Sequence, residues 1–147
     1  MSEVRIKMLD NSKGLDMPHY STESSAGMDL RAAIDQDVVI KSGEVKIIPT
    51  GIALALPENT EAQIRPRSGL AAKNSVTVLN TPGTIDADYR GEVKAILINH
   101  GREDFVVVRG MRIAQMVISH YIKANLKHVN SLDDTERGDG GFGSTGV

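Results

Sequence analysis

The sequence contains no cysteine and no tryptophan, and its only aromatic residues are two Phe and three Tyr. Without cysteine the chain can form neither disulfides nor thiolate zinc sites, so a reducing compartment is permitted. It also lacks an apolar run that could cross a bilayer, a signal peptide at its start, and the basic block that duplex nucleic acid requires. We therefore expect a soluble, cytoplasmic protein that binds neither membranes nor nucleic acid.

What the chain does contain is enough aliphatic residues to fill one core. Its 147 residues are 40% hydrophobic and carry a net charge of −2, which suits a single domain. Short apolar runs alternate with Gly and Pro, a pattern typical of strands joined by turns in a sandwich or barrel. We expect strands over residues 4–9, 38–40, 45–48, 52–56, 61–65, 76–79, 92–99 and 105–108. The predicted fold class is all-β.

Segment 111–123 is ambiguous. Its apolar residues recur at helical spacing, namely Ile113, Ala114, Val117, Ile118, Tyr121 and Ile122. Periodicity alone would predict a helix. A strand buried on both faces would have much the same composition, so the pattern leaves both alternatives open.

The loop 80–92 lies between two apolar runs and contains one Pro and two Gly, which indicates a looped hairpin. Asp86 directly follows the apolar Ile85. A carboxylate held beside a buried residue keeps one direction, as a general base requires. Because Asp, Asn and Gly also favour plain turns, a solvated surface turn is the safer interpretation of this loop by itself.

Two further stretches contain charged residues beside glycine. Ser68 can cap a short helix over 69–73, whose free N–H groups would bind an anion, and Arg67 adds a bidentate phosphate donor. A capped helix without a ligand is the simpler interpretation. Earlier in the chain, Gly27 permits a backbone conformation that a side chain would hinder. A structural ion pair explains Asp29 at least as well as direct catalysis does.

The tail from residue 130 is polar and then rich in glycine, which is usually a plain flexible terminus. Phe142 argues for more, because an aromatic ring among glycines can lie on a base while the surrounding backbone N–H groups bind phosphate. Arg137, Ser144 and Thr145 would add anion contacts. The tail has no Gly-Lys-Ser/Thr and so is no Walker A loop. The four histidines show no metal-ligand spacing.

Five stretches, in this order and at these separations, resemble the five motifs of the homotrimeric dUTP pyrophosphatases (dUTPases): AGMDLRA at 26–32, PRSGL at 66–70, the loop 80–92, GMRIAQM at 110–116 and RGDGGFGSTG at 137–146. The resemblance implies a jelly-roll-like β-barrel over 1–129 and a flexible arm over 130–147 that closes over the active site. It also implies a homotrimer with three active sites at subunit interfaces. Because 112–116 match the fourth motif, the resemblance favours a strand over 111–123.

The same resemblance implies that dUTP is hydrolysed to dUMP and pyrophosphate, which lowers dUTP and supplies dUMP for dTMP synthesis. Asp86 would activate the water that attacks the α-phosphorus. Mg²⁺ would be held by substrate phosphates and water rather than by protein ligands, and Asp29 would act nearby through water or a neighbouring side chain. The phosphate-binding residues would be Arg67, Ser68, Gly69, Gln115, Arg137, Ser144 and Thr145. For Gln115, a satisfied core amide is the plainer interpretation.

The remaining substrate contacts implied by the resemblance concern the base and the sugar. Asn80, and backbone groups that include Lys94, would read the uracil edge, while Phe142 would lie on the ring. Tyr89 would lie against the deoxyribose. The remaining members of the implied substrate-binding set are Thr84, Ile85 and Gly143.

Two other functions remain open at this stage. A dCTP deaminase shares the fold and the trimer, but it needs a proton-shuttling Glu in the base pocket and a different third motif; IDADYRG at 85–91 matches the dUTPase form. The other is a nucleotide-responsive interaction protein that binds a partner through the arm without useful turnover. The intact Asp86 and Tyr89 argue against lost chemistry, but they do not exclude a second binding role.

Overall fold

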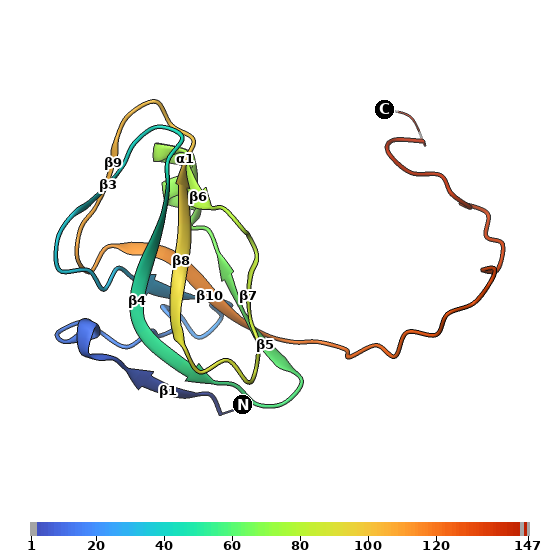
Figure 1. The fold of residues 1–147 in the computed structure, drawn as a ribbon, viewed down its shortest axis with the longest axis horizontal. Helices are drawn as coiled ribbons and strands as arrows, with labels where there is room; N and C mark the ends of the chain where they lie inside the picture. Colours follow the sequence, from blue (N-terminus) through green and yellow to red (C-terminus); the bar gives the residue numbers. More distant parts are fainter. Residues whose placement is uncertain (1–2, 145, 147) are drawn as a thin grey trace.

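The structure, a computed structural model, describes residues 3–144 and 146. Figure 1 shows a body of layered strands from which a long C-terminal segment extends. Over the described residues the strands are β1 (Arg5–Met8), β2 (Met28–Arg31), β3 (Val38–Ile40), β4 (Val45–Ala55), β5 (Thr60–Arg65), β6 (Val76–Val78), β7 (Gly83–Ile85), β8 (Glu92–Asn99), β9 (Phe105–Val107) and β10 (Arg112–His120). A 3-10 turn, η1 (Asp10–Ser12), and one short helix, α1 (Ser68–Asn74), accompany them. The all-β prediction is confirmed.

Two antiparallel four-stranded sheets enclose the core. One has the strand order β1-β4-β8-β6 and the other β2-β10-β5-β7, while β3 and β9 form a separate pair. Along β5, Thr60, Ala62 and Ile64 are buried and the alternating Glu61 and Gln63 are partly exposed, as a one-sided strand requires. Both sheets contribute aliphatic residues to one cluster, including Leu30, Ile48, Ala62, Ile64, Val93, Leu97, Ala114 and Met116.

Strand β4 is a single strand, so the prediction of two strands separated by a turn at 49–51 is wrong. Its pairing with β8 shifts from Pro49 opposite Lys94 to Ala53 opposite Glu92, which leaves extra residues on β4. Such a bulge bends a strand without ending it. Gly51 has a φ of +71° there, and a Cβ on it would lie 2.5 Å from the Cβ of Ser12. The Pro and Gly therefore mark a bend between two halves of one strand.

The loop 80–92 is more structured than the predicted hairpin. β6 and β8 pair antiparallel, as expected for its two flanks. Within the loop, however, β7 pairs with β5 of the other sheet, with Gly83 opposite Ile64 and Ile85 opposite Ala62. The chain thus crosses from one sheet to the other and returns, which fixes both ends of the segment that carries Asp86.

Residues Arg112–His120 form a strand, β10, as the resemblance predicted. The helix that periodicity alone favoured is not formed there. Its pairing with β2 shifts between Arg112 and Ala114, and Ile113 and Ala114 are both buried. Two adjacent buried residues break the alternation of an ordinary strand, which is why the run imitates helical spacing.

After β10 the described residues 121–144 form neither a helix nor a strand and lead away from the sheets (Figure 1). Several of their apolar side chains are almost fully exposed, namely Ile122, Leu126, Leu132 and Phe142. Regular structure thus ends at His120, and the boundary between residues 129 and 130 stays a prediction. No helix in the described part of the chain has the length and apolar content to span a membrane.

Candidate active site

Three segments that are distant in the sequence meet at Asp29 on β2. Its carboxylate accepts hydrogen bonds from Arg67 Nε at 2.9 Å and from Arg112 Nη1 at 3.3 Å. Arg31 instead donates to the carbonyl of Gly110 at 3.0 Å. The ion pair expected for Asp29 is therefore present, and it joins the first, second and fourth motif segments.

Gln115 joins the same three segments. It lies opposite Asp29 in the β2–β10 ladder, and its Nε2 donates to the carbonyl of Pro66 at 3.0 Å. A Cβ on Gly27 would lie 2.5 Å from Gln115 Oε1, whereas the backbone of Gly27 is not left-handed. The expectation that Gly27 is needed for its backbone conformation is therefore wrong; glycine is needed there to leave room for the amide of Gln115.

Helix α1 begins one residue earlier than predicted. Arg67, with an extended backbone (φ −91°, ψ 128°), takes the N-cap position, and no side-chain capping bond is made. Ser68 is already the first helical residue, so its predicted capping role is wrong. Pro66 keeps the preceding residue extended and brings the chain into the helix at this point. Ser68 and Gly69, which follow Arg67 in the chain, are exposed.

Asp86 is exposed and lies directly after β7, between two residues that pack on the core. Ile85 and Ala87 are both partly buried against the core cluster. The turn is closed by Tyr89 N, which donates to Asp86 O at 3.1 Å, and by Arg90 Nη1, which donates to Ala87 O at 2.7 Å. The anchoring expected beside Ile85 is thus present, and the carboxylate itself projects into solvent.

The remaining predicted base- and sugar-contacting residues of this region lie on or beside β6, β7 and β8. Asn80 follows β6, and its Nδ2 would lie 3.3 Å from a Cβ on Gly83. Thr84 is exposed on β7, and Lys94 is exposed on β8 opposite Pro49. Tyr89 donates its hydroxyl to the carbonyl of Glu92 at 3.1 Å.

The arm folds into tight turns of its own. Arg137 Nε donates to Gly140 O at 3.0 Å, and a Cβ on Gly140 would lie 2.9 Å from Ser144 Oγ. The side chain of Phe142 is fully exposed, and Gly143 has a φ of +84°. Of the site residues expected here, Thr145 lies outside the described residues. Within this chain the described arm residues, up to residue 144, are not brought to Asp29 or Asp86 (Figure 1).

Asp86 and Arg67 lie at opposite ends of β5. Since Ile85 pairs with Ala62, Asp86 lies beyond that pair, near the start of β5, whereas Arg67 comes two residues after the end of β5 at Arg65. At a strand rise of about 3.3 Å per residue, the stretch from Ala62 to Arg67 spans roughly 16 Å. The guanidinium group also reaches Asp29 on β2, across β10 and away from β7. Within a single chain, the candidate base is therefore distant from the candidate phosphate-binding residues.

Two residues that matter to this geometry were not among the predicted site residues. Arg112 is the second partner of Asp29, and the carbonyl of Pro66 orients Gln115. Local sequence pattern does not signal that Arg112 and Asp29 are close, because their proximity depends on the β2–β10 register. The Arg112 side chain does stand within the fourth motif, which was the one available indication.

Comparison with known proteins gives a consistent result. The dUTPase family model matches residues 13–146 of the chain. Over 147 residues the chain is 63% identical to the deoxyuridine 5'-triphosphate nucleotidohydrolase of Rickettsia bellii, covering all of this chain and 97% of that protein. It is 61% identical over the same length to the Rickettsia felis protein of that name, of which 99% is covered.

The fold comparison agrees. The solved Staphylococcus bacteriophage 80alpha dUTPase with dUPNHPP matches with a TM-score of 0.88 and 27% sequence identity, and both chains are covered completely.

Proposed function

Because the chain belongs to the dUTPase family, we propose that it hydrolyses dUTP to dUMP and pyrophosphate, lowering dUTP and supplying dUMP for dTMP synthesis. The observation that carries this proposal is the meeting of three separate motif segments at Asp29, Arg67 and Gln115. Family membership predicts these residues as parts of one phosphate site. A cytoplasmic location remains a prediction from the composition.

Asp86 is the proposed general base. It orients a water and takes its proton as the water attacks the α-phosphorus in line, with pyrophosphate leaving from the opposite side. The packing of Ile85 and Ala87 supports this role, because it fixes the backbone from which the carboxylate projects. General-base assistance of this kind is worth about 10²–10⁴-fold in rate.

The phosphate chain would be bound by cationic and amide donors. Arg67 can donate two hydrogen bonds to a phosphate group in bidentate fashion, and Asp29 holds its guanidinium group in place at 2.9 Å. Ser68 and Gly69 present the exposed start of α1, and Gln115 adds an amide oriented by Pro66. The arm would close over the phosphates with further donors from Arg137, Gly143, Ser144 and Thr145.

The donors of this chain fit phosphate better than they fit a directly bound cation. The carboxylate of Asp29 is already shared by two guanidinium groups, and among the described residues no three His, Asp or Glu side chains gather into a metal site. Mg²⁺ would therefore be carried by the substrate phosphates and water, as suits an ion that keeps several waters. When bound, it would neutralise part of the phosphate charge.

Base and sugar selection would come from the third motif and the arm. Asn80 offers both a donor and an acceptor, as the uracil edge does, and backbone groups around Lys94, Thr84 and Ile85 would complete the pocket. Phe142 would stack on the base. Cytosine is rejected because mismatched partners would be left unpaired, and thymine because its methyl group would be crowded.

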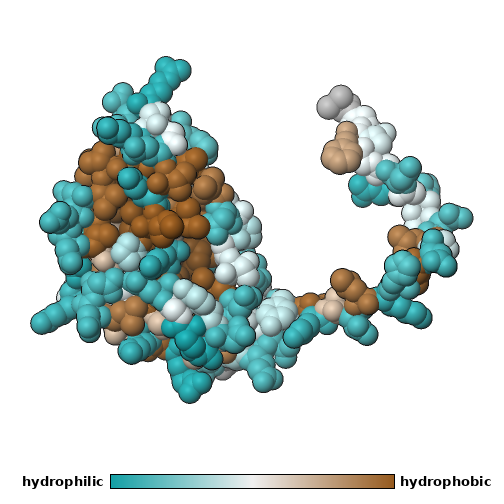
Figure 2. Space-filling model, viewed as in Figure 1, coloured by the Kyte–Doolittle hydropathy of each residue, from teal (hydrophilic) through white to brown (hydrophobic). Residues whose placement is uncertain are grey.

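An apolar sheet face supports the homotrimer. On the outer face of β4 and β8, Val45 pairs with Ile98 and Ile47 with Ile96, and Leu79 N bonds to Ile96 O alongside. Ile47 is 62% exposed. Figure 2 shows the resulting hydrophobic area over these strands. Apolar patches of this kind on soluble proteins mark interaction sites. In a homotrimer, copies related by a threefold rotation axis would cover this face.

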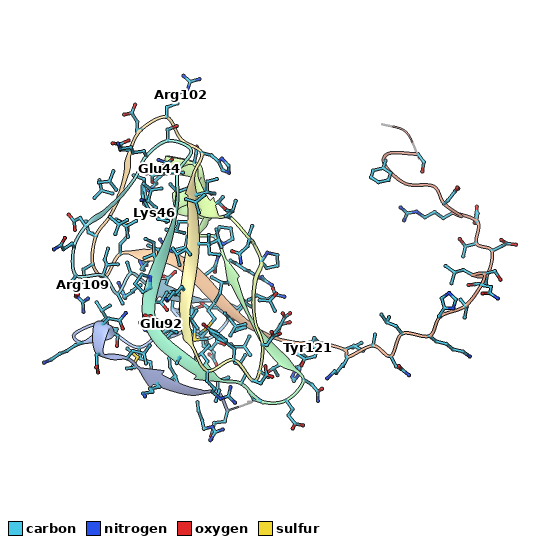
Figure 3. All side chains as sticks on the ribbon, in the orientation of Figure 1. Glu44, Lys46, Glu92, Arg102, Arg109 and Tyr121 are labelled. Carbon is cyan, nitrogen blue, oxygen red and sulfur yellow. The ribbon has the colours of Figure 1, made fainter. Side chains whose placement is uncertain are left out.

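The same assembly would complete the active site. Asp86 and Arg67 of one chain are roughly 16 Å apart along β5 at normal strand rise, too far for both to act on one phosphate. A site at a subunit interface would combine Asp86 and Tyr89 of one copy with Asp29, Arg67 and Gln115 of the next. The arm leaves its own barrel at Tyr121, labelled in Figure 3, in a direction that suits reaching a neighbour.

Pyrophosphate release from dUTP with Mg²⁺ tests the function, with dCTP, dTTP and UTP as controls. We expect release from dUTP and at least about a hundredfold less from the other three, since a base-reading site discriminates at this level or better. Ammonia released from dCTP would indicate the deaminase instead. A chain that binds dUTP without releasing pyrophosphate would refute the proposed hydrolysis.

A further inference from the structure

The ring of Tyr89 folds back over Gly91. A Cβ on Gly91 would overlap the Tyr89 hydroxyl and would lie 2.6 Å from Cζ and 3.0 Å from Cε2. The separations from the hydroxyl and from Cζ are shorter than real Cβ contacts, so any side chain at this position must displace the ring. The backbone of Gly91 is not left-handed, so the requirement for glycine here is one of space.

The hydroxyl of Tyr89 is also held by Glu92, the residue that follows Gly91. It donates to the carbonyl oxygen of Glu92 at 3.1 Å. Tyr89 nevertheless stays 44% exposed. The ring of Tyr89 is thus held by its contact with Gly91 and by the hydrogen bond of its hydroxyl to a carbonyl. The exposed part of the ring therefore has a defined orientation.

Glu92 is itself anchored to two other parts of the chain. Its Oε1 accepts from Asn11 Nδ2 at 2.6 Å and from Gly51 N, in the β4 bulge, at 3.0 Å. Asn11 also donates to the carbonyl of Ala33 at 3.3 Å. The carbonyl that receives the Tyr89 hydroxyl therefore has a fixed place at the start of β8, where Figure 3 labels Glu92.

We propose that Gly91 and Glu92 are positioning residues that place the Tyr89 ring against the sugar site and thereby set how strongly the enzyme prefers deoxyribose over ribose. This inference rests on the proposed function, in which Tyr89 lies against the deoxyribose. A ribose differs by one hydroxyl group, so its rejection depends on how close the ring stands. Displacing the ring in any direction disturbs its fit to deoxyribose, and the contacts that hold the ring are those with Gly91 and with the carbonyl of Glu92.

The test compares the kcat/KM values for dUTP and UTP in Gly91→Ala, Tyr89→Ala and the double variant. Gly91→Ala should lower the dUTP/UTP ratio by about tenfold or more, because a displacement near 1 Å is enough to cost large factors in a well-fitted site. In the Tyr89→Ala background the added methyl meets no ring, so Gly91→Ala should change the ratio by less than about twofold, as expected when one residue acts through the other.

Gly101→Ala is the matched control. Gly101 lies just beyond the other end of β8, near the labelled Arg102 in Figure 3, and a Cβ on it would lie 2.6 Å from the carbonyl oxygen of Asn74. It should lower the melting temperature while leaving the dUTP/UTP ratio unchanged. This separates loss of stability from loss of selectivity.

Glu92 supplies a second test that does not depend on Gly91→Ala folding. Glu92→Ala removes the acceptor of Asn11 and Gly51 and should lower the ratio, whereas Glu92→Gln keeps Oε1 and should restore it. An unchanged ratio in both Gly91→Ala and Glu92→Ala, or an equal effect of Gly91→Ala with and without Tyr89, would overturn the inference. A wild-type protein that releases no pyrophosphate from dUTP would refute the proposed function as well, so the two failures are distinguishable.

Discussion

Asp29 and Arg67 stand 38 residues apart in the sequence and form a 2.9 Å ion pair that ties β2 to the residue before α1. Both side chains are about one-quarter exposed, at 26% and 25%, so the pair is shielded on most sides. The pair fixes the direction of the Arg67 guanidinium group, which we propose as a phosphate donor.

Asp29→Ala should therefore raise the KM for dUTP by about tenfold or more, because hydrogen bonds to charged groups contribute about 1.5–3 kcal/mol each when well placed. Steady-state kinetics on dUTP measures this. The control is Asp35→Ala, since Asp35 is 94% exposed and lies 4.0 Å from Arg109. Exposed pairs of that kind contribute little, so its KM should stay within twofold of wild type; an equal rise in both variants would count against the positioning role of Asp29.

Asp86→Asn should lower kcat by about 10²–10⁴-fold, the range of general-base assistance, and should leave the Kd for dUTP within a few-fold. Isothermal titration and single-turnover kinetics separate the two quantities. Asp88→Asn is the matched control, because Asp88 is an exposed carboxylate of the same loop, and it should turn over at nearly the wild-type rate. Normal turnover by Asp86→Asn would remove Asp86 from the mechanism.

The sequence predicted most of the strands because alternation and β-branched composition report burial directly. It did not predict that β4 continues through Pro49 and Gly51, since proline and glycine signal both turns and bulges. What distinguishes the two here is the carboxylate of Glu92, which accepts from Gly51 N at 3.0 Å and is 41 residues away. A contact at that separation leaves no local signal.

The candidate site shows the same limit. Composition and spacing singled out Asp86, but for the loop alone a surface turn was the safer interpretation, and the family resemblance was needed to choose between the two. Neither could show that Asp86 and Arg67 fall at opposite ends of β5. That separation follows from the pairing of β7 with β5, and register between distant strands is set by the whole core.

Deleting residues 137–147 should abolish hydrolysis of dUTP while leaving the barrel folded. No described residue after His120 belongs to the buried core, so the melting temperature should change by no more than about 2 °C, since few contacts are lost. Circular dichroism and pyrophosphate release measure the two effects. Phe142→Ala alone should raise the KM by about 10–100-fold, the worth of one base–aromatic stack. An unfolded truncation would show that the arm is structural.

Ile47→Glu should convert the proposed trimer into monomers, because it puts a charge in the middle of the apolar face of β4 and β8. Analytical ultracentrifugation would show the loss of a species of three times 15.8 kDa. Val106→Glu provides the control: Val106 is also exposed, at 41%, but lies on the separate β3–β9 pair. If both variants or neither lost the trimer, the face of β4 and β8 would not be its interface.

A mixture of two inactive variants would show whether each site draws on two chains. Asp86→Asn and Arg67→Ala should each be nearly inactive as pure trimers. If Asp86 of one chain acts on phosphates bound by Arg67 of another, co-refolding equal amounts should recover about one quarter of the wild-type activity, because in random closed trimers that fraction of interfaces carries both intact residues. If both residues served a site within one chain, every site would carry one defect and the mixture would stay inactive. Recovery of activity therefore requires the composite site that the roughly 16 Å separation along β5 implies.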